Sequence, residues 1–91
     1  MSIPTVNEIR DKLRRLTDYK QTSVFGISVT RWPGWDDRPY EIETMAIRPG
    51  WGECYAARII SEMLNNVNYH EAVTKVTGRN IRKSFNKGKS Q

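Results

Sequence analysis

The only thiol and the only imidazole in the chain belong to Cys54 and His70. A nucleophile and its base must lie within hydrogen-bond reach of each other, and a third group must orient the imidazole. Their spacing does not suggest such a pair. Cys54 falls on a predicted core helix, and His70 falls in the first turn of another, where the helix dipole opposes an imidazolium. The sequence predicts no catalytic residue, and we expect a protein that is not an enzyme.

Metal and phosphate sites also lack the residues they need. One Cys and one His cannot supply the four ligands of a structural zinc ion. Glu41 and Glu43 share one face of a predicted strand, where acidic side chains are usually solvated. Gly50-Trp51-Gly52 precedes a predicted helix, but Glu53 would repel a phosphate at that helix N-terminus. We therefore expect no metal and no cofactor.

Positive charge is concentrated near the C-terminus. The chain holds 15 Lys and Arg against 10 Asp and Glu, which gives a formal net charge of +5. Residues 67–91 contain six Lys and Arg and one acid, Glu71, so their net charge alone is +5. The balance is +2 over residues 1–20 and −2 over residues 21–66. Such a segregation of charge favours an anionic partner.

Residues 72–85 resemble a compressed helix-turn-helix, with a short helix, a turn at Gly78 and a second helix anchored by Ile81 and Phe85. In the major groove Arg suits guanine and Asn suits adenine, whereas Lys favours phosphate. The alternative is one helix, a glycine stop and a solvated basic tail that binds phosphates of DNA or RNA without reading their sequence. The candidate nucleic-acid-binding residues are Lys75, Arg79, Asn80, Arg82, Lys83, Lys87 and Lys89, with Arg10, Arg14 and Arg15 of the first predicted helix.

Three tryptophans, Trp32, Trp35 and Trp51, lie in or beside Pro-Gly turns. Aromatic residues at such positions anchor protein partners, although Trp51 is also placed to cover a small core. Trp35 is followed by two aspartates, which favours a protein over a nucleic acid at that point. The second hypothesis is therefore a small protein-binding regulator or inhibitor of the mobile-element (phage-like) type. It would dock on a larger host enzyme through these tryptophans and the hairpin.

The elements that position these residues follow from periodicity and capping. Thr5 and Glu8 have capping-box spacing, which predicts a helix from about Val6 to Tyr19. Alternation predicts strands over residues 23–32 and 40–48, joined by the turn-rich residues 33–39 into an antiparallel hairpin. Helices are expected over residues 53–66, 69–77 and 79–85. The prediction is a single α+β domain, residues 1–85, of order α-β-β-α-α, in which helices cover the hairpin, with a disordered basic tail at residues 86–91.

Size and composition limit the remaining possibilities. With 91 residues the chain has room for one small core. No apolar run approaches the roughly 18 residues that span a bilayer, so we expect no membrane contact. A lone cysteine is typical of a reducing, cytoplasmic setting. A two-stranded sheet is marginally stable alone, so a homodimer that pairs along the hairpin edge is a further prediction.

Overall fold

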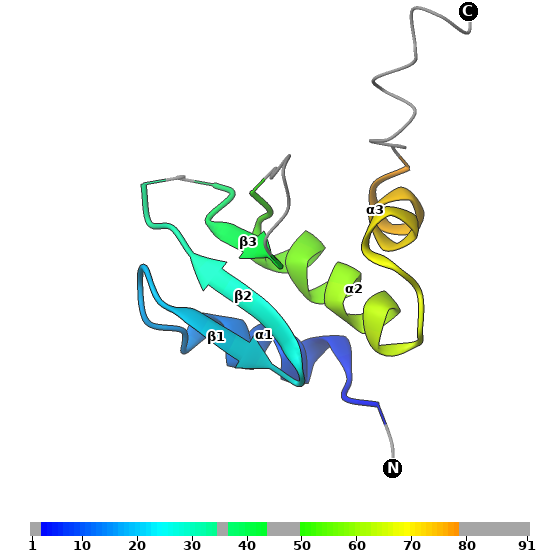
Figure 1. The fold of residues 1–91 in the computed structure, drawn as a ribbon, viewed down its shortest axis with the longest axis horizontal. Coiled ribbons are helices and arrows are strands. Elements are labelled where there is room, and N and C mark those ends of the chain that lie inside the picture. Colours follow the sequence, from blue (N-terminus) through cyan, green and yellow to red (C-terminus); the bar gives the residue numbers. More distant parts are fainter. Residues whose placement is uncertain (1–2, 35–36, 44–49, 79–91) are drawn as a thin grey trace, which may run out of the picture.

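A computed structural model describes residues 3–34, 37–43 and 50–78 (Figure 1). Within these ranges the chain forms three helices and one three-stranded sheet, and the α+β class predicted from the sequence is confirmed. In chain order the elements are α1 (Val6–Arg14), β1 (Gln21–Val24), β2 (Ile27–Arg31), β3 (Tyr40–Ile42), α2 (Glu53–Leu64) and α3 (Tyr69–Thr77).

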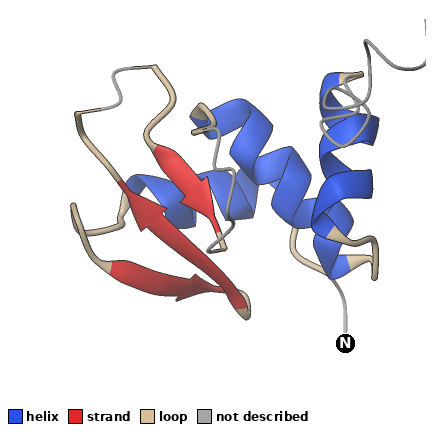
Figure 2. Ribbon diagram, turned by 45° about the horizontal axis from the view of Figure 1, so that its top comes forward, coloured by secondary structure: helices blue, strands red, loops and turns tan. Residues whose placement is uncertain are grey.

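The strands form an antiparallel sheet in the order β1-β2-β3. Helix α1 lies behind the sheet and packs against α2, and α3 lies on the other side of α2 (Figures 1 and 2). The core contains residues of every element, because each strand places alternate side chains toward the helices. It consists of Ile9, Leu13, Leu16, Val24, Ile27, Val29, Tyr40, Ile42, Trp51, Ala56, Ala57, Ile59, Ile60, Tyr69, Ala72 and Val73.

The first predicted strand is in fact two strands, so the order is α-β-β-β-α-α. The chain reverses at Phe25 and Gly26, whose φ angles of 51° and 93° are both positive, and Val24 then pairs with Ile27. The apolar alternation runs through this two-residue turn without a break, which is why periodicity alone predicted one strand. Phe25, one of the alternating apolar residues, lies in the turn and is 42% exposed.

The second hairpin forms as predicted, with β2 and β3 paired antiparallel across the loop of residues 32–39. Strand β3 is short, and the rest of the predicted strand, residues 44–48, lies outside the described residues. Beyond them, Trp51 returns to the sheet and exchanges two backbone hydrogen bonds with Tyr40, of 2.9 and 3.0 Å. Trp51 thereby covers part of the β3 edge.

Capping residues set the helix ends largely where the sequence placed them. Thr5 and Glu8 form the expected capping box of α1, although α1 ends at Arg14, before Tyr19. Asn68 caps α3 by accepting a hydrogen bond from the Glu71 N–H, and Gly78 ends α3 in the left-handed conformation with φ of 76°. The predicted helix over residues 79–85 and the tail lie outside the described part of the chain.

Substitution of Phe25 by Asn is expected to stabilise the fold. A left-handed backbone costs an ordinary L-residue about 1–2 kcal/mol, and Asn-Gly is the preferred pair for a turn with two positive φ angles. The loss of the contact between the Lys12 ammonium and the Phe25 ring, 5.6 Å from its centroid, offsets roughly 0.5–1 kcal/mol of this gain. Urea unfolding should show a net increase in stability of up to about 1 kcal/mol.

The matched control is Gly26→Ala, which places a Cβ at φ of 93° and should lower the unfolding midpoint. A lower midpoint for Phe25→Asn would show that the Phe25 side chain contributes more to stability than the turn geometry costs.

Candidate nucleic-acid interface

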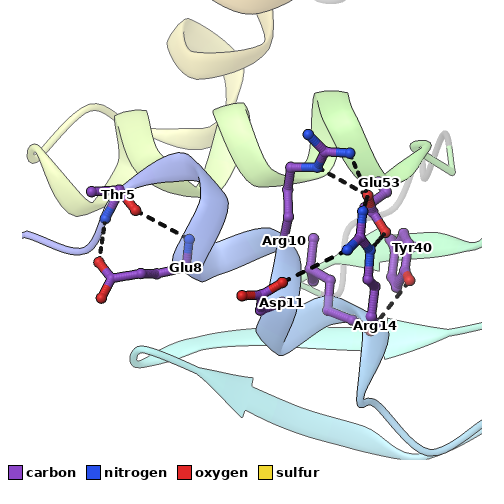
Figure 3. Close-up of polar contacts among 8 residues, drawn as sticks. Thr5, Glu8, Arg10, Asp11, Arg14, Tyr40 and Glu53 are labelled. Atoms are coloured by element: carbon purple, nitrogen blue, oxygen red, sulfur yellow. Dashed lines mark hydrogen bonds and ion pairs between the residues drawn. The ribbon is translucent and has the colours of Figure 1, made fainter.

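Two of the candidate cations, Arg10 and Arg14, bind the carboxylate of Glu53 at the start of α2. Arg10 Nε donates to Oε1 at 2.9 Å, and Arg14 donates from Nε to Oε2 at 2.6 Å and from Nη2 to Oε1 at 3.0 Å. Figure 3 shows both guanidinium groups converging on this carboxylate from α1. The two helices that pack together are therefore also joined by an ion-pair cluster.

The cluster shifts the ionisation of its members. The hydrogen bond from Arg14 is the main cause that lowers the pKa of Glu53, and the hydrogen bond from Arg10 acts in the same direction against partial burial. The hydrogen bond to Glu53 in turn raises the pKa of Arg14 above its usual value. Glu53 thus supplies Arg10 and Arg14 with a counter-charge inside the protein, which makes them less available to a phosphate.

Lys75, on α3, is also paired within the protein. Its Nζ lies 3.6 Å from Oε1 of Glu62, near the end of α2. Glu53 and Glu62 are nine residues apart on one helix, which corresponds to about two and a half turns and about 13–14 Å along the axis. The two carboxylates therefore face opposite sides of α2, and the cations on α1 and α3 do not meet in one patch.

Arg15 is exposed at the end of α1, where its backbone N–H caps the helix. Among the candidate cations that the structure describes, it is the one for which no acidic partner is found. The remaining candidates, Arg79, Asn80, Arg82, Lys83, Lys87 and Lys89, all lie outside the described residues.

The described residues as a whole carry no net charge. Residues 3–34, 37–43 and 50–78 contain nine Lys and Arg and nine Asp and Glu. The net charge of +5 therefore comes from the rest of the chain. Residues 79–91 alone supply five cations, namely Arg79, Arg82, Lys83, Lys87 and Lys89, and no acid.

The tryptophans predicted to bind a partner differ in accessibility. Trp51 is only 8% exposed, and its indole Nε1 donates a 2.9 Å hydrogen bond to the Tyr69 hydroxyl in the core. It covers the core and is not a surface anchor, which corrects the prediction that it binds a partner. Trp32 is half-buried and donates from Nε1 to Glu41 Oε1 at 2.6 Å. Trp35 lies outside the described residues.

Sequence reasoning missed two surface features near Trp32. Glu41, expected on a solvated face, is only 7% exposed because the Trp32 side chain lies against it. Tyr19, expected at the end of a helix, is 68% exposed and touches the Trp32 ring edge-on, with centroids 6.0 Å apart. Tyr19 adopts φ of 64° and its N–H donates to the Arg31 carbonyl, a local turn that helical periodicity does not reveal.

The thiol and the imidazole lie on different helices. Cys54 is exposed on α2, whereas the sequence placed it in the core. His70 lies in the first turn of α3 as expected, and no hydrogen bond to its Nδ1 is found. Within the described ranges no group of three His, Cys, Asp or Glu residues is arranged to hold a metal ion. No helix in that part of the chain has the length and apolar character needed to cross a membrane.

Replacement of Glu53 by Gln tests the ion-pair cluster through its pH dependence. Because the folded state lowers the pKa of Glu53, its stabilising effect is complete above the ordinary glutamate pKa and is lost as pH falls through the lowered value. At pH 7 the variant should be less stable by about 1 kcal/mol or less, as is usual for partly exposed pairs. Urea unfolding from pH 7 down to pH 3 should show the two proteins converging at low pH. A difference that is independent of pH would contradict this role of the cluster.

Comparison with known proteins finds no relative of this chain. A scan against protein-family models finds no matching family, and searches of curated proteins and of solved structures find no match. The candidate interface is defined by the charges and contacts of the chain itself.

Proposed function

We propose that this protein binds nucleic acid, without catalysing a reaction, through phosphate contacts made by the cations of residues 79–91. The observation that carries the proposal is the distribution of charge. The described residues are neutral, whereas residues 79–91 hold five Lys and Arg and no acid. A dense run of cations without local counter-charge is the composition that attracts a polyphosphate backbone.

The ion pairs of the described residues support this division of roles. Glu53 and Glu62 each bind cations of a neighbouring helix, so these carboxylates are engaged within the protein. Arg10, Arg14 and Lys75 then serve mainly to hold the helices together. The proposed contact set narrows to Arg79, Arg82, Lys83, Lys87 and Lys89, with Asn80 as a base contact and Arg15 as an accessory cation.

The fold supplies an attachment for this segment. Residue 79 follows Gly78, an exposed residue at the end of α3, and α3 is the helix farthest from the sheet (Figure 1). In sequence, the cations of residues 79–91 therefore follow directly on this helix. In this proposal charge neutralisation supplies most of the affinity, and base reading is limited.

The salt dependence of binding tests the proposal. Five phosphate contacts on duplex DNA should give a slope of about −4.5 in log affinity against log salt, at about −0.9 per contact. The triple variant Arg82→Gln, Lys83→Gln, Lys87→Gln leaves two of these cations, so its slope should fall to about −1.8. Fluorescence anisotropy with a labelled duplex, titrated at several salt concentrations, measures both slopes.

A second triple variant distinguishes the effect of losing the proposed phosphate contacts from the effect of lowering the net charge. Lys20→Gln, Arg38→Gln and Arg58→Gln remove the same three charges from exposed positions of the described fold. This control should keep the steep slope. Equal loss of slope in the two triple variants, or a flat salt response of the unaltered protein, would contradict the proposal.

The second candidate function is docking on a protein partner, and it is favoured by one observation, the exposed Tyr19 ring packed against Trp32. With Trp51 buried, this pair is the aromatic surface that such a partner would contact. Tyr19→Ala should leave nucleic-acid binding unchanged if the first proposal holds. Capture of a protein from nuclease-treated lysate, abolished by Tyr19→Ala, would favour the second.

A further inference from the structure

The outer edge of β1 is an unpaired strand edge. In antiparallel sheets the N–H and C=O of one residue point to the same side, and successive residues alternate. The Ser28 carbonyl accepts a hydrogen bond from Glu43 of the β3 side, so the Ser28 backbone points away from β1. Ser23, opposite Ser28, and Gln21, opposite Thr30, therefore direct their backbone groups away from β2.

Within the described ranges, nothing covers that edge. β1 is the terminal strand of the sheet, and neither a helix nor a strand lies beyond it in either view (Figures 1 and 2). No backbone hydrogen bond from another element reaches Gln21 or Ser23. Natural edge strands are commonly protected by Lys or Pro, but β1 has the sequence Gln-Thr-Ser-Val and contains neither.

Exposed aromatic residues flank the same strand. Four large hydrophobic side chains are exposed among the residues described, and two of them, Tyr19 and Phe25, lie at the two ends of β1. Both have positive φ, a conformation unfavourable for aromatic residues, so the fold holds them outward at a cost in backbone energy. Exposed apolar groups beside an open edge are typical of a contact surface.

We propose that two copies of this chain pair antiparallel through β1, with Thr22 of each copy opposite Thr22 of the other. The register follows from the backbone directions. Within β1, only Gln21 and Ser23 direct their backbone N–H and C=O groups outward. An antiparallel neighbour therefore forms the most hydrogen bonds when Gln21 of each copy faces Ser23 of the other. That pairing is two-fold symmetric about Thr22 and gives four hydrogen bonds in a six-stranded sheet.

The flanking residues agree with this register. Tyr19 and Phe25 are equally far from Thr22 in sequence, so each Tyr19 end lies beside the Phe25 end of the second copy. Lys20 lies opposite Val24 of the other chain, so the pairing sets no like charges against each other. The described residues are neutral overall, which removes net repulsion between the two folds.

Cysteine substitution tests the register directly. Thr22 and its symmetry mate form a pair that is not hydrogen-bonded, in which Cα atoms lie about 4.5 Å apart, within the range that a disulfide spans. In a Cys54→Ser background, Thr22→Cys should form a covalent dimer under mild oxidation many times faster than Gln21→Cys or Ser23→Cys. Those two variants place the thiols of the two copies out of register. Equal rates for the three variants, or no dimer of any, would overturn the proposal.

A charge-swap experiment tests it without covalent chemistry. Gln21→Lys with Ser23→Lys sets Lys against Lys in the dimer, and Gln21→Glu with Ser23→Glu sets Glu against Glu. Sedimentation equilibrium should give a concentration-dependent mass for the unaltered protein, a monomer for each double variant, and a dimer when the two variants are mixed. Because both positions are exposed, circular dichroism should show unchanged folds. A monomeric unaltered protein at every concentration, or double variants that dimerise alone, would overturn it.

Discussion

Helix α2 must bury two sides at once, and the rest of the structure depends on that requirement. Its residues Ala56, Ala57, Ile59 and Ile60 are fully buried, with α1 packed on one side and α3 on the other. In a chain this short no second core is available to either outer helix. The small alanines allow close approach, and the large isoleucines supply apolar area, which contributes about 25 cal/mol per Å² removed from water. The carboxylates of α2 then pair with cations of both neighbours.

This use of carboxylates explains the division of charge along the chain. Each acid of α2 that binds a neighbouring helix removes a cation from the set that a polyanion can reach. The described fold is balanced in this way, and the unbalanced cations are those that follow α3. Structural pairing and the proposed phosphate binding thus involve different residues of one basic sequence.

Local chemistry was predictable from the sequence, and tertiary contacts were not. Thr5 with Glu8, Asn68 with Glu71, and Gly78 each act within one turn of helix, so their spacing alone located the start of α1 and both ends of α3. Phe25-Gly26 carries no Asn or Asp to indicate a tight turn, so the first hairpin was missed. The partners of Arg14 and Trp51 lie 39 and 18 residues away, and no periodicity reveals such distances. Sequence reasoning therefore identified the cations but not which of them are paired within the fold.

Trp51 links two parts of the molecule that are otherwise far apart. Its backbone is bonded to Tyr40 in β3, and its indole holds the Tyr69 hydroxyl at the start of α3. Detachment of α3 would leave a donor in the core unsatisfied, at a cost of about 1–3 kcal/mol. The position of α3 is thus coupled to the β3 edge through a single buried side chain.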